Sequence, residues 1–155
     1  MFLKIPKNIY VLGCFIMAMI LIEPLVKIII NGHAVPGERV KEKLFGGFCK
    51  CGGIMYQKLW LKQDNYKILV SECEKCWRNE ALSFNGRKAL AWRDEVKVID
   101  RTDLGDFLKE HLTKAEYEAL EAKAHNKEYN YNALSRAKKK LEEMGLSVEE
   151  VVSYL

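Results

Sequence analysis

The chain opens with a long apolar run and continues with short alternating segments and then helical periodicity. Residues 9–22 are continuously apolar, and the apolar character resumes over residues 25–30 around Lys27. A spanning helix needs about 20 apolar residues, so residues 9–30 reach that length only by including charged positions. We predict an N-terminal apolar helix over residues 1–30. It can be a single-pass membrane anchor, a buried or partner-facing helix, or a product of a start codon placed too far upstream.

Two hairpins are predicted after this run. Residues 54–61 and 66–72 are rich in β-branched, aromatic and aliphatic residues, and the polar segment 63–65 between them is typical of a turn. Residues 80–84 and 87–92 flank Asn85-Gly86, a dipeptide suited to the positive φ angles of a type I′ turn. Residues 44–93 are therefore expected to form a small antiparallel sheet.

The spacing changes after Asp94 from period two to the helical period. Helix start signals predict four helices: one capped by Thr102 or Asp103, one opened by a Thr113–Glu116 capping box, one from Asn130 or Asn132 to Met144 before Gly145, and one opened by Ser147 and Glu150. We expect residues 94–155 to form a helical domain.

The elements together predict an α+β protein of 155 residues. The expected units are the apolar helix (1–30), a linker (31–43) containing Gly32, Pro36 and Gly37, a cysteine-bearing sheet (44–93) and the helical domain (94–155). Charge is uneven along the chain: residues 31–93 hold twelve Lys and Arg against six Asp and Glu, whereas residues 94–155 hold ten against fourteen. The middle unit is therefore basic and the last one acidic.

Four of the five cysteines fall in two tight pairs. Cys49 and Cys51 form a C-x-C, Cys73 and Cys76 form a C-x-x-C, and 21 residues separate the pairs. Pairs at the ends of two hairpins can bring four thiolates onto one tetrahedron, which suits Zn²⁺. A closed shell of four thiolates leaves no open position for catalysis, so we expect a structural zinc and no enzyme; iron in a similar site, or a redox-active dithiol, is the alternative.

These residues also carry a family resemblance. The run Cys49-Lys50-Cys51-Gly52-Gly53, followed after a hairpin by Cys73-Glu74-Lys75-Cys76, resembles a zinc ribbon of the type common in archaeal transcription and translation proteins. The likeness covers about 45 residues. Zinc ribbons normally carry two residues between the first two cysteines, whereas this chain has only Lys50. The resemblance implies a non-catalytic, nucleic-acid-associated protein.

A second resemblance lies in the helical region. A capped helix, a short polar connection and a helix carrying Arg136 and Lys138–Lys140 are similar in order to a helix-turn-helix domain. In such domains the second helix reads the major groove of DNA. The acidic excess of residues 94–155 favours instead a helical packing or dimerisation module, and both interpretations stay open.

The candidate nucleic-acid contacts follow from the basic and aromatic residues. Lys and Arg neutralise phosphates, and exposed aromatic rings stack on bases. The residues expected to contact phosphate are Arg78, Arg87, Lys88 and Arg93, which lie near Trp77 and Trp92, and, in the helical region, Arg136, Lys138, Lys139 and Lys140. The competing hypothesis is a protein-interaction adaptor that displays Trp77 and Trp92 and dimerises through its tail, with or without a membrane anchor at residues 9–30. Basic residues 39–43 after the run favour a cytoplasmic location for residues 35–155.

Overall fold

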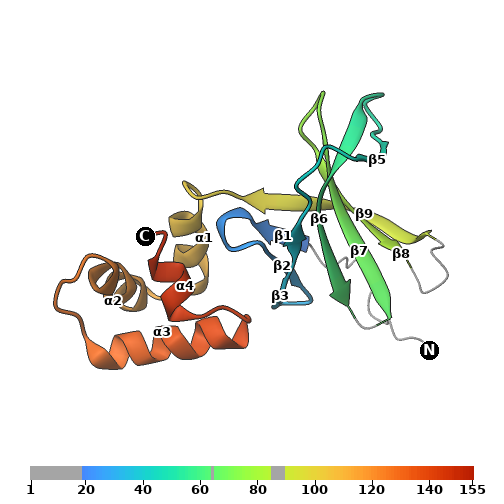
Figure 1. The fold of residues 1–155 in the computed structure, drawn as a ribbon. Helices are drawn as coiled ribbons and strands as arrows, with labels where there is room; N and C mark the ends of the chain where they lie inside the picture. The colour runs from blue at the N-terminus through green and yellow to red at the C-terminus, as the bar shows by residue number, and fades with distance from the viewer. Residues whose placement is uncertain (1–18, 64, 85–89) are drawn as a thin grey trace.

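The computed structural model describes residues 19–63, 65–84 and 90–155, which form a β-sheet unit followed by a helical unit (Figure 1). The strands are β1 (Met19–Ile22), β2 (Lys27–Ile30), β3 (His33–Pro36), β4 (Glu38–Arg39), β5 (Phe45–Phe48), β6 (Ile54–Gln63), β7 (Tyr66–Cys73), β8 (Asn79–Phe84) and β9 (Leu90–Ile99). A short 3₁₀ helix, Glu23–Leu25, joins β1 to β2. The helices are α1 (Leu104–His111), α2 (Lys114–Ala124), α3 (Tyr131–Glu143) and α4 (Val148–Val152).

The strands form one sheet that curls until its ends nearly meet. Its order is β3-β2-β1-β9-β8-β7-β6-β4, and β5 adds to β6 outside this path. The terminal strands β3 and β4 are consecutive in the chain and joined by Gly37 alone. At this closure the Gly37 N–H donates to the Val26 carbonyl at 2.9 Å, and a Cβ on Gly37 would lie 2.9 Å from Leu59 Cδ1. Residues 31–43, treated above as a linker, therefore contain the two strands that close the barrel.

The prediction of an N-terminal apolar helix is wrong over the described residues. Residues 19–30 form two strands, and β1 pairs in parallel with β9, Leu21 opposite Val98. Residues 19–22 are all apolar because β1 is buried on both faces: Leu21 lies in the barrel core, whereas Ile22 packs against the helices. A strand covered on both faces reads as a continuous hydrophobic run, which periodicity alone does not distinguish from a helix. Residues 1–18 lie outside the described part.

None of the helices in the described part of the chain is long and apolar enough to cross a membrane. The membrane anchor expected over residues 9–30 is therefore not supported, because residues 19–30 contain strands β1 and β2 and no spanning helix.

The two hairpins were correctly predicted in the strands that the structure describes. Strands β6 and β7 pair antiparallel from Met55 opposite Cys73 to Gln63 opposite Tyr66, and β8 pairs with β9 from Asn79 opposite Val96. The expected type I′ turn at Asn85-Gly86 lies outside the described residues. Another Asn-Gly pair, Asn31-Gly32, joins β2 to β3 with positive φ at both residues.

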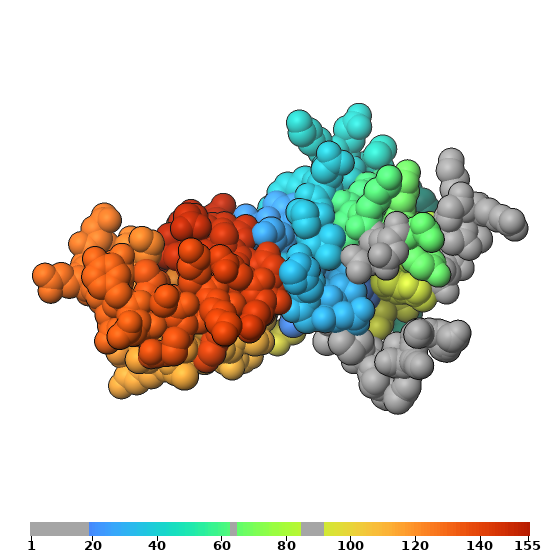
Figure 2. All heavy atoms as spheres, turned by 90° about the horizontal axis from the view of Figure 1, so that it is seen from below, coloured from blue at the N-terminus to red at the C-terminus, as the bar shows by residue number. Residues whose placement is uncertain are grey.

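The four helices are confirmed, and so are the start signals of α2, α3 and α4; Asp103 is at the N-cap of α1, but its side chain makes no capping hydrogen bond. Thr113 with Glu116, and Ser147 with Glu150, form complete capping boxes, and the Asn130 side chain accepts the Ala133 N–H. The helices pack against the outer face of β1–β3, so Ile22, Ile29 and Ala34 share one core with residues of all four helices. In Figure 2 the orange and red helices lie against the blue strands.

Polar contacts also join the two units. Lys27 Nζ donates to Glu150 Oε2 at 2.8 Å and to the Gly145 carbonyl at 3.0 Å. The Ala34 N–H, on the outer edge of β3, donates to the Met144 carbonyl at 2.7 Å. This bond pairs an edge-strand donor with the end of α3, so the helices cover part of an edge that would otherwise be open to pairing.

Replacing Gly145 with alanine is expected to destabilise this junction by about 2–5 kcal/mol. Gly145 has φ +80°, which costs an alanine about 1–2 kcal/mol, and its Cβ would lie 2.8 Å from both the N and O atoms of Ala34, which adds about 1–3 kcal/mol of overpacking. Gly32→Ala is the matched control, because Gly32 has φ +79° and open space around it. Urea unfolding should show a clearly larger loss for Gly145→Ala. Equal losses would mean that the junction tolerates the added methyl group.

Candidate metal centre

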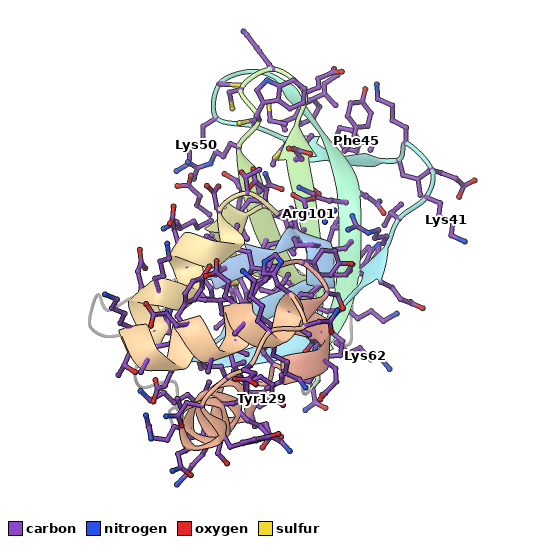
Figure 3. All side chains as sticks on the ribbon, turned by 90° about the vertical axis from the view of Figure 1, so that its left-hand side faces the viewer. Lys41, Phe45, Lys50, Lys62, Arg101 and Tyr129 are labelled. Atoms are coloured by element: carbon purple, nitrogen blue, oxygen red, sulfur yellow. The ribbon has the colours of Figure 1, made fainter. Side chains whose placement is uncertain are left out.

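The four paired cysteines lie in two turns that meet at one end of the sheet. Figure 3 labels Lys50, which stands between Cys49 and Cys51, at this end, away from the helices. Cys49 follows β5 and Cys51 lies in the turn to β6, whereas Cys73 ends β7 and Cys76 lies in the turn to β8. The antiparallel pairing of β6 with β7 sets Met55 opposite Cys73, which brings the two turns together. We call residues 41–54 and 73–78 the cysteine tip.

The four Sγ atoms form a compact cluster. All lie within 4.8 Å of one another, with Cys49 Sγ 3.6 Å from Cys76 Sγ and Cys51 Sγ 3.5 Å from Cys73 Sγ. Metal–sulfur bonds of about 2.3 Å in a tetrahedron set the sulfurs roughly 3.8 Å apart. The cluster is therefore close to the size that a metal ion with four thiolate ligands requires, and it could hold one.

Backbone N–H groups surround the sulfurs. The Gly53 N–H donates to Cys51 Sγ at 3.4 Å, and the N–H groups of Lys75 and Cys76 donate to Cys73 Sγ at 3.3 and 3.5 Å. Gly53 is also required by space, because a Cβ there would lie 2.7 Å from Cys73 Sγ and 2.8 Å from Lys75 Cβ. The turns thus orient the ligands and stabilise negative charge on them.

The crowded thiols have divergent pKa values. The pKa of Cys73 is lowered to about 7, mainly because its sulfur accepts the Cys76 N–H. Burial opposes this shift, and the Lys75 N–H and the thiols of Cys51 and Cys76 add to it. A hydrogen bond from the Arg78 N–H lowers the pKa of Cys76, but burial and the neighbouring thiols outweigh it and raise this pKa to about 12. The thiols are those of Cys49, Cys51 and Cys73. Ionisation of one thiol therefore disfavours ionisation of its neighbours, and the charge of a bound cation offsets this repulsion.

Comparison with known proteins places the chain in a family. Residues 18–98 match the AF0631-like N-terminal beta-barrel domain, and residues 101–154 match the AF0631-like C-terminal four-helix domain. The chain belongs to the AF0631-like family. It is 48% identical over 132 residues to an uncharacterized protein of Archaeoglobus fulgidus, an alignment that covers 85% of this chain and 95% of that protein. No solved structure matches the chain.

Both sequence resemblances are therefore wrong. The hairpins of this AF0631-like protein are not an independent zinc ribbon, since β6–β9 are consecutive strands of a barrel completed by β1–β4. The helical region is a four-helix domain, not a helix-turn-helix domain. Two basic residues of α3 pair with Glu116 of α2: Lys140 Nζ lies 2.7 Å from Glu116 Oε1, and Arg136 Nε lies 3.4 Å from Glu116 Oε2. The expected fold class of a small ribbon sheet with a separate helical domain is corrected to a barrel that shares a core with its helices.

Two of the expected nucleic-acid contacts in the sheet bind a buried carboxylate. Arg78 Nε donates to Glu80 Oε2 at 2.7 Å, and Arg93 Nε donates to Glu80 Oε1. Arg93 also donates to the Phe48 carbonyl at 2.6 Å, and Arg78 pairs with Glu95 at 3.0 Å. Burial opposes ionisation of Glu80, but the two arginines outweigh it and hold its pKa below the ordinary value.

Of the remaining expected contacts, those that the structure describes lie apart from the cysteine tip. Lys138 and Lys139 are exposed on α3, in the helical unit. Arg87 and Lys88 lie outside the described residues. The structure thus brings the four cysteines together but does not gather the expected basic residues on one surface near them.

Sequence reasoning missed the apolar surface of the tip and the role of Glu80. Phe45, Phe48 and Trp77 are exposed there, Phe48 and Trp77 by 66% and 68%. Trp77 and Trp92 were considered for display, whereas Phe45 and Phe48 were not, because aromatic residues in a small sheet often form its core. The sequence did not show that Glu80 is buried between two arginines: Arg78 lies two residues before it, but Arg93 comes from the next strand.

Proposed function

We propose that Cys49, Cys51, Cys73 and Cys76 bind one structural Zn²⁺ ion, and that the protein is a non-catalytic, nucleic-acid-associated protein that acts through the tip this ion holds together. The observation that carries the proposal is the set of four Sγ atoms within 4.8 Å of one another. Four thiolates in a tetrahedral arrangement are typical ligands of structural zinc, and they occupy every coordination position. Iron in the same ligands is the main alternative.

The metal has a clear structural task at this end of the molecule. The only buried hydrophobic cluster near the turns, among the described residues, consists of Cys49, Met55 and Cys73. So small a cluster contributes little hydrophobic stabilisation, whereas zinc contributes roughly 10–16 kcal/mol of apparent binding free energy in zinc-finger peptides. Zinc binding therefore supplies the free energy that orders the tip.

Support for nucleic-acid association comes from the surface of the tip. It contains five Lys or Arg and two Glu. Lys50 and Lys75 are exposed, and in the described part of the chain no ion pair joins them to an acidic side chain. Exposed aromatic rings beside unpaired cations are typical of surfaces that bind bases and phosphates.

The proposal is tested by fluorescence anisotropy with the zinc-loaded full chain and labelled oligonucleotides, both duplex and single-stranded, across a salt series. We expect saturable binding that weakens as salt rises and disappears when zinc is chelated. No binding to any oligonucleotide at low salt would overturn nucleic-acid association. The exposed rings would then favour the adaptor hypothesis, with a protein partner on the tip.

Replacing Gly53 with alanine is expected to weaken zinc binding at least about tenfold, because the new Cβ displaces Cys73 Sγ or Lys75 Cβ. Competition with a chromophoric chelator measures the affinity. Gly52→Ala is the matched control: Gly52 has φ +90°, so alanine is strained there as well, but its Cβ meets open space. An affinity loss no larger for Gly53→Ala than for Gly52→Ala would contradict the packing argument.

A further inference from the structure

The cysteine tip has an unusual residue in its second turn. Trp77 has φ +67°, a left-handed conformation that is rare for bulky side chains. Its N–H donates to the Cys73 carbonyl at 3.0 Å, and Asn79 Nδ2 donates to the Trp77 carbonyl at 3.2 Å, which holds the strained conformation. Glycine would adopt this turn without strain. Because the indole is 68% exposed, neither burial nor turn geometry accounts for a tryptophan here.

A second exposed ring and two exposed lysines are sequence neighbours of the same cysteines. Phe48 directly precedes Cys49 and Trp77 directly follows Cys76, and the sulfurs of these cysteines are 3.6 Å apart. Lys50 and Lys75 flank the same two cysteines on their other sides. Each of these two cysteines therefore lies between an aromatic residue and a lysine in the sequence, and the Phe48 ring packs edge-on against Phe45, with their centres 5.1 Å apart. Figure 3 places the labelled Lys50 at this end of the molecule.

A groove of about 500 Å³ adjoins Trp77. Its lining includes Arg39, Lys43 and Tyr56, with Lys43 Nζ 4.4 Å from the centre of the Tyr56 ring. This volume is within the range of small-molecule sites and large enough for one nucleobase. A base entering the groove would meet the tyrosine and tryptophan rings. Glu72 and Glu74 also line the groove, and Lys43 pairs with Glu74 at 3.7 Å, so the groove offers stacking surfaces more than free cations.

We infer that the cysteine tip binds single-stranded nucleic acid, with unpaired bases stacked on Trp77 and Phe48 and the backbone phosphates on Lys50 and Lys75. This inference rests on the proposed function and names its substrate class. Single strands expose the faces of their bases, whereas a duplex covers them. Duplex binding depends mainly on many phosphate contacts.

The charge of the tip also favours stacking over phosphate contacts. Its five basic and two acidic residues leave a small positive surplus. A Zn²⁺ ion with four thiolates carries a formal charge of about −2, which leaves a surplus of only about +1. Two phosphate contacts on a single strand give a slope of log K against log salt of about −1.4, much shallower than for most duplex binders.

The test uses the zinc-loaded full chain with labelled oligonucleotides of about 12 nucleotides: single-stranded DNA, single-stranded RNA and a duplex of the same sequence. Trp77→Gly removes the ring and relieves the turn. It should lower single-strand affinity between about 5- and about 150-fold. Zinc stoichiometry should stay the same, and the melting temperature should stay the same or rise. A residue with only a structural role would not combine these effects. The DNA and RNA arms show which strand is preferred.

Two further variants keep the test decisive. Phe48→Ala, in β5, should weaken binding without altering the second turn, and Tyr131→Ala, a 77% exposed ring on α3, should leave affinity unchanged. Duplex binding as tight as single-strand binding, with Trp77→Gly and Phe48→Ala both without effect, would overturn this inference and leave nucleic-acid association standing. Failure of every oligonucleotide to bind would overturn both, and zinc content measured on the same sample would still report on the metal proposal separately.

Discussion

Replacing Cys73 with serine is expected to abolish zinc binding and to unfold the cysteine tip. Cys73 is fully buried, accepts two backbone N–H groups and lies 3.5 Å from Cys51 Sγ, so no other group can take its place. A serine hydroxyl is a poor ligand for zinc, and loss of a structural metal is among the changes that cost more than about 4 kcal/mol. Metal analysis should fall from one zinc per chain to none, with a lower melting temperature.

Lys50→Ala is the control for this variant. Lys50 lies between two ligands in the sequence, but its side chain is exposed, so zinc content and melting temperature should stay unchanged. Chelation of the unaltered protein should reproduce the melting temperature of Cys73→Ser, because both remove the same ion. A Cys73→Ser protein that retains one tightly bound zinc would show that the other three cysteines, or a different site, bind the metal.

Replacing Glu80 with glutamine is expected to destabilise the barrel by about 3–5 kcal/mol. The Glu80 side chain is only 1% exposed and pairs with the guanidinium groups of both Arg78 and Arg93. Its removal leaves two cations beside a buried neutral group, and breaking a buried pair in this way is strongly destabilising. Urea unfolding measures the loss; Glu95→Gln, whose 58% exposed carboxylate meets Arg78 alone, should cost less than about 1 kcal/mol.

The same carboxylates give stability a defined pH dependence. The pKa values of Glu80 and Glu116 both lie below the ordinary glutamate value, although burial opposes this. Arg78 and Arg93 lower the pKa of Glu80, and Lys140 lowers that of Glu116. The unfolded chain therefore takes up these protons first, so the stabilisation is present above about pH 4.5 and declines as the pH falls through the folded pKa values. Glu80→Gln should make the acid limb of the stability curve shallower. An unchanged limb would contradict the role of Glu80.

The cysteine cluster and the helices were predictable because local spacing determines them. Two cysteine pairs at the ends of consecutive hairpin strands have to meet when those strands pair, and the capping boxes at Thr113 and Ser147 satisfy helix N-termini through residues three positions away. None of these arguments requires knowledge of the rest of the chain.

The barrel was not predictable in this way, because its closure joins distant segments. The parallel pairing of β1 with β9 sets Met19 opposite Val96, and no local signal in either strand specifies that partner. The same pairing explains the apolar run, since β1 is covered by the barrel core on one side and by the helices on the other. The ion pair of Glu80 with Arg93 likewise depends on the register of β8 with β9.

Metal analysis of the purified full chain, combined with its visible absorption spectrum, tests whether the four cysteines bind one structural zinc ion. We expect one zinc per chain, a colourless protein, and four thiols, counted apart from Cys14, that become reactive only when the zinc is chelated. One iron per chain with visible absorption would replace structural zinc by an iron centre. A metal-free protein with four freely reactive thiols would contradict the metal centre altogether.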